Sequence, residues 1–231
     1  MTGSSAFQSR PRLKVCCIAR VEEAELAIRH GADAIGLVSE MPSGPGVISD
    51  RLIEEIAARI PPDVASFLLT SSREVGVIVD QKRRFNVNTI QLCDHLSPDA
   101  LDELRSIIPK VSIVQVIHVV GENALAMARS AARVADSLLL DSGDPTKVEK
   151  ELGGTGRTHN WALSRALREE VGIPVCLAGG QTPHNVAEAV RRVRPFGIDV
   201  CSGQRIAGRL DEDRLRRFVL NLRNEHVSPT S

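Results

Sequence analysis

Apolar runs alternate with amphipathic segments about eight times along this chain of 231 residues. The runs are rich in Val, Ile and Leu and are nearly continuous, which is typical of parallel strands that are buried on both faces. They predict strands over residues 13–18, 33–38, 64–69, 89–92, 111–117, 136–140, 173–177 and 197–200.

The segments between these runs carry the apolar spacing of helices. Three of them open with a start signal, a short polar side chain or a proline in the first turn. These signals are Ser49-Asp50, Ser97-Pro98-Asp99 and Thr182-Pro183. The predicted helices cover residues 21–29, 50–59, 72–84, 98–108, 123–132, 160–171, 183–192 and 212–222.

Strands and helices follow one another without a linker-like insertion, so the sequence predicts one domain, an α/β protein with a single (β/α)8 TIM barrel over residues 12–224. Residues 1–11 are predicted to be a disordered lead-in, and residues 225–231 a flexible tail. A doubly wound open sheet is the structural alternative. It should show GxGxxG after the first strand, where this chain has Cys16-Cys17-Ile18-Ala19-Arg20.

Charge and cysteine usage narrow the class of protein. Lys plus Arg and Asp plus Glu both number 29, so the net charge is zero, and neither nucleic acid nor a membrane surface is the predicted partner. The five cysteines have no CxxC spacing, which favours reduced thiols in a cytoplasmic protein over a disulfide framework.

Three late strands end in small or glycine-bearing segments: Asp141-Ser142-Gly143, Ala178-Gly179-Gly180 and Cys201-Ser202-Gly203. Glycines let backbone N–H groups approach an anion, and the last two βα turns of a barrel are the usual phosphate site. Gly179, Gly180, Ser202 and Gly203 are therefore the predicted phosphate ligands.

Proton-transfer candidates lie where predicted strands end. Cys16 and Cys17 point to opposite faces, so only one of them can face the barrel interior, and a small core residue is the alternative reading. Asp141 follows an apolar run, where partial desolvation favours the protonated form that a general acid needs; a capping or loop aspartate is the alternative. Asp199, inside the last strand, needs a partner, so it is functional or paired with an arginine.

Two further patterns carry less information. The segment 153–158 precedes a helix and resembles a phosphate-contacting loop, with Gly154 and Arg157 as candidate contacts, yet it lacks the GK[ST] of a Walker A motif and also fits a plain loop. Cys16, Cys93 and Cys201 could open onto one barrel mouth, but no pair has metal-ligand spacing, so no metal is predicted.

Taken together, the ordered segments resemble the phosphoribosylanthranilate isomerase family over about residues 13–218. In the first half, the family's K-I-C-G-I-T, G-A-D-A-I-G, V-G-V-F and Q-L-H-G are matched by residues 14–19, 31–36, 75–78 and 91–94. In the second half, its L-L-D-S, G-G-T-G-K-T-F-D-W, L-A-G-G-L-x-P-x-N-V and V-D-V-S-S-G-V-E are matched by residues 139–142, 153–161, 177–186 and 198–205.

The resemblance implies a cofactor-independent Amadori rearrangement, an aldose-to-ketose isomerisation in tryptophan biosynthesis. It implies that Asp141 protonates the furanose ring oxygen and that Cys16 takes the proton from the sugar C2. It also implies a small phosphosugar substrate, held by the two glycine turns, and a chain that is a monomer or a homodimer.

The chain differs from the family mainly at positions that contact the substrate in the family. Pro45 stands where the family has an arginine for the anthranilate carboxylate, and Arg205 stands where it has a glutamate. Arg205 or Arg157 is the candidate replacement for that arginine, because a guanidinium and a carboxylate pair in a fixed fork. The open alternatives are a barrel that isomerises another phosphoribosylamine and a non-catalytic barrel that only binds a phosphosugar.

Overall fold

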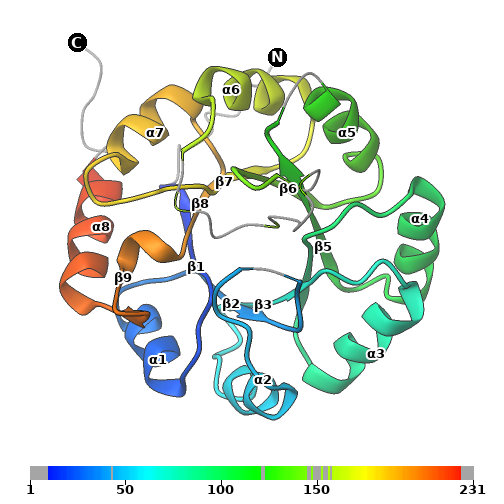
Figure 1. The fold of residues 1–231 in the computed structure, drawn as a ribbon, viewed down its shortest axis with the longest axis horizontal. Coiled ribbons are helices and arrows are strands. Elements are labelled where there is room, and N and C mark those ends of the chain that lie inside the picture. The colour runs from blue at the N-terminus through cyan, green and yellow to red at the C-terminus, as the bar shows by residue number, and fades with distance from the viewer. Residues whose placement is uncertain are drawn as a thin grey trace, which may run out of the picture.

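Eight parallel strands form a closed barrel in the computed structural model, which describes residues 10–42, 44–120, 123–144, 147, 152, 156 and 158–224. Each strand pairs with the next one in the sequence, and the last returns to the first. The helices surround the barrel (Figure 1), which confirms the predicted (β/α)8 fold. The strands are β1 (Arg12–Val15), β2 (Ala34–Val38), β3 (Ala65–Thr70), β4 (Thr89–Leu92), β5 (Ser112–His118), β6 (Ser137–Asp141), β7 (Val175–Leu177) and β8 (Gly197–Val200).

The outer helices begin at capping residues that the sequence shows. Ser49 accepts a hydrogen bond from the Leu52 backbone N–H, and Ser97 accepts one from Ala100 before a first-turn proline. Asn160 caps the sixth helix in the same way. The helices are α1 (Val21–Arg29), α2 (Asp50–Ala57), α3 (Val75–Phe85), α4 (Pro98–Ile107), α5 (Asn123–Ala131), α6 (Trp161–Glu170), α7 (Val186–Val193) and α8 (Glu212–Asn224).

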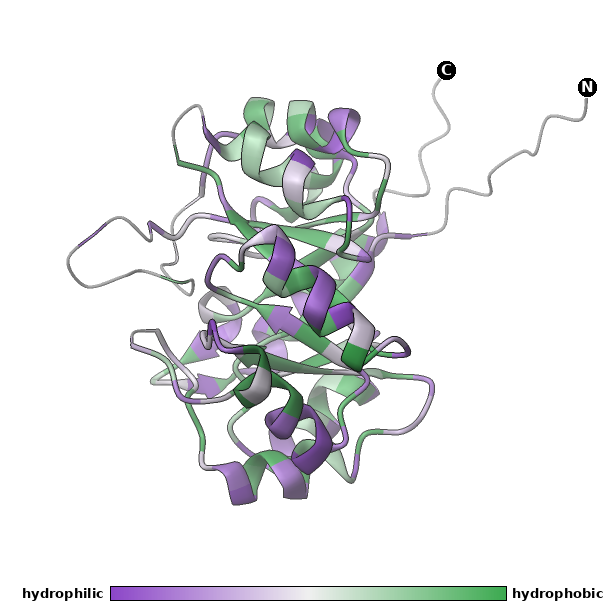
Figure 2. Ribbon diagram, turned by 90° about the vertical axis from the view of Figure 1, so that its right-hand side faces the viewer, coloured by the Kyte–Doolittle hydropathy of each residue, from purple (hydrophilic) through white to green (hydrophobic). Residues whose placement is uncertain are grey.

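The strands separate two cores, because successive side chains point to opposite faces of the sheet. Leu13 and Val15 belong to the larger core between strands and helices. Cys16 belongs to the smaller core inside the barrel, and Lys14 reaches across that interior to β4 and β8. Figure 2 shows the strands as a largely hydrophobic interior wrapped by helices with mixed faces. This explains why the apolar runs are nearly continuous.

Barrel closure joins the two ends of the fold. The β1–β8 register pairs Arg12 with Gly197 and Val15 with Val200. One residue further, the Cys16 N–H donates to the Val200 carbonyl at 2.8 Å. The last strand therefore fixes the position of the residue that follows β1.

The boundaries differ from the predictions in a few places. β1 ends at Val15 instead of residue 18, because Cys17 has φ of 59° and cannot continue a strand. Helix α7 begins at Val186 instead of Pro183, since residues before it form a turn in which Asn185 accepts the Thr182 N–H. A short 3-10 helix, η1 (Ser202–Gln204), and the hairpin strands β9 (Arg205–Ile206) and β10 (Arg209–Leu210) were not predicted.

Most of the predicted lead-in, residues 1–9, and the predicted tail, residues 225–231, lie outside the described residues. Arg10, by contrast, belongs to the fold, because its guanidinium pairs with Asp33 at 2.7 Å. Within the described part of the chain, no helix is long and apolar enough to cross a membrane.

Candidate active site

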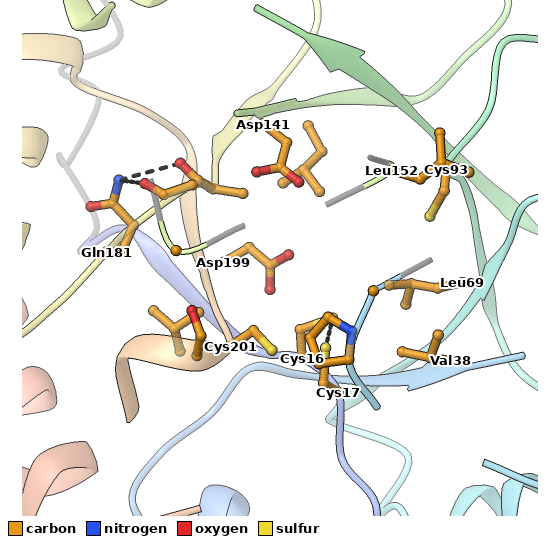
Figure 3. A pocket seen from close by; sticks show the side chains of 18 of the residues that line it. Cys16, Cys17, Val38, Leu69, Cys93, Asp141, Leu152, Gln181, Asp199 and Cys201 are labelled. Atoms are coloured by element: carbon orange, nitrogen blue, oxygen red, sulfur yellow. Dashed lines mark hydrogen bonds between the residues drawn. The ribbon is translucent and has the colours of Figure 1, made fainter. Parts of the chain in front are cut away.

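A cavity opens at the carboxyl ends of the barrel strands (Figure 3). It encloses about 650 Å³, part of which is open to solvent. Active sites of (β/α)8 enzymes lie at this end of the barrel. The predicted residues that line it are Cys16, Asp141, Gly179, Gly180, Asp199, Ser202 and Gly203.

Cys16 lies just beyond β1, with only 4% of its surface exposed. Its Sγ lies against Gly36 of β2, where a Cβ added to the glycine would come within 2.9 Å of the sulfur. Any larger residue at position 36 would displace the thiol, so the glycine that ends the 31–36 motif makes room for Cys16.

Asp141 ends β6 and is 7% exposed. Its Oδ1 accepts the Ser142 N–H at 2.7 Å, which orients the carboxyl group. Figure 3 shows Asp141 and Cys16 on opposite walls of the cavity, with Asp199 between them. A carboxyl and a thiol that face one space are the minimum for an acid and a base acting on one substrate.

Asp199 is paired with a buried cation, as its position in the last strand required. Lys14 Nζ lies 2.8 Å from Asp199 Oδ2 and 2.9 Å from Gln91 Oε1. Burial works to lower the pKa of Lys14, but Asp199 and the nearby thiols outweigh it and raise that pKa, so the ammonium stays charged. Burial raises the pKa of Asp199, and Lys14 opposes the rise. The partner is thus a lysine of β1 and not an arginine.

The two glycine turns present backbone N–H groups to the cavity. Gly179 and Gly180 have φ of 76° and 61°, which L residues rarely adopt. At Gly203, an added Cβ would overlap the Gln181 carbonyl oxygen, so the turn after β8 packs directly on the turn after β7. The N–H groups of Gly179, Gly180, Ser202 and Gly203 donate to no other group in the described part of the chain. They are therefore available to an anion.

Amide side chains fix these turns, and the sequence analysis did not predict them. Gln181 donates to the carbonyls of Ala178 and Gly179, and Asn185 donates to the Gly180 carbonyl at 2.9 Å. Gln204 donates to the Gln181 carbonyl at 3.1 Å. These bonds fix the carbonyls of the turn after β7 and tie the turn after β8 to it, so the two turns form one rigid unit. The signal in the sequence was the Gln that directly follows each glycine turn.

Cys17 occupies a left-handed position where the family has glycine, so it lines the cavity together with Cys16, and the prediction that only one of the two could face the interior is wrong. A φ of 59° costs a residue with a Cβ roughly 1–2 kcal/mol. The side chain lies on Gly46, where an added Cβ would overlap Cys17 Cβ. Cys17 and Gly46 therefore fit each other, and they seat the loop that carries Pro45 against the end of β1.

Arg205, a predicted substrate contact, is not among the described residues that line the cavity. Its guanidinium pairs with Glu23 at 3.1 Å and donates to the carbonyls of Cys16 and Cys17 at 3.3 and 2.5 Å. Both charged side chains are nearly buried, at 9% and 8% exposed. Arg205 thus holds the turn that carries Cys16. Gly154 and Arg157, the other predicted contacts, lie outside the described residues.

Pro45 lines the cavity where the family has its arginine. Within the described residues, no lysine, arginine or histidine lines this space. Cys93, where the family has histidine, is fully buried there, and burial together with Cys16 raises its pKa to about 12. In the same described set, no group of three His, Cys, Asp or Glu side chains is placed to hold a metal ion.

Comparison with known proteins identifies the family. The family described as N-(5'phosphoribosyl)anthranilate (PRA) isomerase matches residues 13–221. The chain belongs to this family. The match confirms the predicted family and, with it, the predicted isomerase function in tryptophan biosynthesis.

Relatives and solved structures agree with this assignment. The chain is 35% identical over 216 residues to N-(5'-phosphoribosyl)anthranilate isomerase 2 of Methanosarcina mazei, covering 93% of this chain and 95% of that one. It is similar to phosphoribosyl anthranilate isomerase from Thermotoga maritima, with a TM-score of 0.80 and 27% identity over 93% and 99% of the chains. Another similar structure, at a TM-score of 0.77 and 26% identity over 93% and 99%, is a phosphoribosyl anthranilate isomerase in complex with reduced 1-(o-carboxyphenylamino)-1-deoxyribulose 5-phosphate.

Proposed function

We propose that this chain isomerises N-(5'-phosphoribosyl)anthranilate to 1-(carboxyphenylamino)-1-deoxyribulose 5-phosphate, with Asp141 as general acid and Cys16 as general base. The observation that carries the proposal is the placement of these two groups on opposite walls of one cavity, beside two turns with available N–H groups. Family membership supplies the reaction, and the cavity supports the assignment of roles.

The reaction begins at the furanose ring. Asp141 gives its proton to the ring oxygen, the bond from C1 to that oxygen breaks, and the nitrogen lone pair forms a Schiff base with C1. The Cys16 thiolate then takes the proton from C2, and the electron pair of that bond forms the enolamine. Loss of the O2 proton and protonation of C1 give the ketone. The rearrangement oxidises C2 and reduces C1 of the same molecule, so the proton transfers need no external oxidant or reductant.

A buried cation lies beside the proposed base. The charged ammonium of Lys14 lies in the same interior and interacts with the Cys16 thiolate. A nearby cation favours the thiolate form, which is the basic and nucleophilic form of cysteine. Asp199 also lines the cavity, and its Oδ1 has no hydrogen-bond partner within the described residues. This oxygen can accept a hydrogen bond from a hydroxyl group of the sugar.

The substrate phosphate is proposed to bind the four available N–H groups of Gly179, Gly180, Ser202 and Gly203. Anchoring one end of the substrate holds C1 and C2 between the acid and the base, which lowers the entropic part of the barrier. A Cβ added to Gly156 would lie 3.5 Å from Ser202 Oγ, so this part of the β6–α6 loop lies beside the same turn.

Turnover of freshly generated phosphoribosylanthranilate, followed by loss of its fluorescence, tests the assignment. Cys16→Ala and Asp141→Asn should each lose at least ~10²-fold in kcat. Cys176→Ala is the matched control, because this thiol lies lower in the barrel, outside the cavity, and should leave turnover unchanged. Full activity of either site variant would reject its role.

The cavity lining favours a second candidate substrate. Pro45 replaces the family's arginine, and among the described residues no cationic side chain lines the cavity to bind a carboxylate. Another phosphoribosylamine, one without a carboxylate, would then be accepted. A series that compares kcat/KM for phosphoribosylanthranilate and for the phosphoribosylamine of aniline decides between them. An equal or higher value for the second compound would favour the alternative.

We further propose that the protein acts in the cytoplasm, since its cysteines are free thiols, and that it is a monomer or a homodimer. Sedimentation at several concentrations tests the oligomeric state.

A further inference from the structure

Four cysteines surround the mouth of the barrel: Cys16, Cys17, Cys93 and Cys201. Three of them, Cys17, Cys93 and Cys201, stand where the family motifs carry glycine, histidine and serine. These three departures are separated by up to 184 residues in the sequence, from 17 to 201, yet they all lie around the same cavity as the Cys16 sulfur. Cys17 is the neighbour with the most direct contact.

We propose that Cys17 is a positioning residue for the base, and that its thiol donates a hydrogen bond to the Cys16 thiolate and so stabilises the reactive form. The distance between the two sulfurs is 3.8 Å, with Cys17 as the donor. Both side chains are buried, at 4% and 6% exposed, so water does not compete well for the contact. The turnover part of this inference rests on the proposed role of Cys16 as the base, whereas the hydrogen bond itself does not.

The backbone supports a functional reading of Cys17. A non-glycine residue with φ of 59° is strained, and such strain persists where surrounding structure requires it. Here Arg205 holds the Cys17 carbonyl, and Gly46 leaves space for the side chain. The result is a thiol fixed against Cys16, where glycine would offer no donor.

Protonation states agree with this direction of donation. The contact with Cys16 is the main factor that raises the pKa of Cys17 well above its ordinary value, followed by a contact with Cys201 and by burial. Cys17 therefore keeps its proton at pH values where an ordinary cysteine ionises. Cys201 competes for the same proton, and its own pKa is lowered mainly by that contact with Cys17. The titratable and charged groups around the pair are Lys14, Glu23, Cys93, Asp199, Cys201 and Arg205.

During turnover, Cys16 passes from thiolate to thiol when it takes the C2 proton, and Cys17 keeps its own proton throughout. A hydrogen bond that favours the thiolate raises the fraction of enzyme with an ionised base at neutral pH. Its removal should therefore move the pH at which the base becomes active.

The test compares Cys17→Ala with Cys17→Ser. Both keep a Cβ in the strained conformation, so they share the backbone cost, and only the serine retains a donor. The readout is the pH dependence of Cys16 alkylation by iodoacetamide, located by peptide mass spectrometry, together with the pH profile of kcat/KM. In Cys17→Ala both midpoints should move up by about one pH unit, and in Cys17→Ser they should stay near the wild-type value.

Cys17→Gly guards against a variant that fails to fold, because glycine removes both the strain and the donor. It should melt at or above the wild-type temperature and still show the raised midpoint. Equal midpoints in wild type, Ala and Gly variants would overturn the proposal, as would the same shift in Ala and Ser. Alkylation needs no substrate, so a failure of Cys16 as the catalytic base would be seen in turnover alone.

Discussion

The ion pair inside the barrel makes a quantitative prediction for Lys14→Met. The ammonium has three neighbours: Asp199 Oδ2 at 2.8 Å, Gln91 Oε1 at 2.9 Å and the Phe67 ring, whose centroid is 5.1 Å away. Methionine fills a similar volume but removes the charge. Asp199 is then left buried, with its Oδ1 already without a hydrogen-bond partner among the described residues.

Removing one partner of a buried pair costs about 3–5 kcal/mol of the free energy of unfolding. For a chain of this size each kcal/mol corresponds to about 2–4 °C, so a cost of about 4 kcal/mol lowers the melting temperature by about 8–16 °C. The sign with pH follows from Asp199. Burial raises its pKa, so the carboxyl destabilises the fold once it ionises, and the variant should lose more stability as pH rises through that pKa.

Calorimetric melting of wild type, Lys14→Met, and Lys14→Met combined with Asp199→Asn measures this. The second substitution removes the orphaned charge and should recover most of the loss. Arg84→Met is the control, because its pairs with Asp50 and Glu54 are exposed to solvent and should change the melting temperature far less. If Lys14→Met melts within about 2 °C of the wild type, or if Asp199→Asn adds to the loss, the reasoning about this pair is wrong.

Two other charged contacts give predictions with different readouts. Arg205→Met should lower the free energy of unfolding by about 3 kcal/mol, because it leaves Glu23 buried without its ion-pair partner and no longer holds the turn at Cys16. In turnover, KM for the substrate should change less than kcat. A large rise in KM alone would instead support Arg205 as a substrate ligand. Partial burial works to raise the pKa of Asp33, but hydrogen bonds from the Leu13 N–H, Arg10 and Arg12 outweigh it and lower that pKa. The ionised carboxylate therefore contributes its full stabilisation of the fold above the ordinary pKa of 3.8, and this stabilisation is lost as pH falls through the lowered pKa. Urea unfolding of Asp33→Asn should show a flatter dependence of stability on pH in that acidic range, and an unchanged slope would contradict the role of Asp33.

The fold could be predicted almost completely from the sequence, because each strand is buried on both faces and each helix has its own apolar stripe. The eight strands overlap their predicted positions, and the errors come from local geometry. At Cys17, a left-handed backbone conformation ends β1 early, and a cysteine in the sequence gives no indication of that conformation. At 205–210, strands of two residues are too short to leave a periodic pattern.

The position of a residue at the cavity was predictable where it lies on a strand or directly after one, as for Cys16, Asp141 and Asp199. It was not predictable where the role depends on a distant partner. Arg205 suggested a substrate clamp until the structure placed it on Glu23, 182 residues away in the sequence. The lysine that neutralises Asp199 is 185 residues away from it. Such pairings are set by the closed topology and leave no local signal.

The pairing of β1 with β8 also has a consequence for how the protein is made. The sequence of the first strand leaves the ribosome early, but its partner begins only at Gly197. Until then Lys14 has no Asp199, Cys16 has no Val200 carbonyl, and the turn at Cys17 has no Arg205 to hold it. A nascent chain can carry most of its helices before the cavity residues Cys16 and Asp199 are brought together. Activity should therefore arise late and in one step during synthesis, when the final strand closes the barrel.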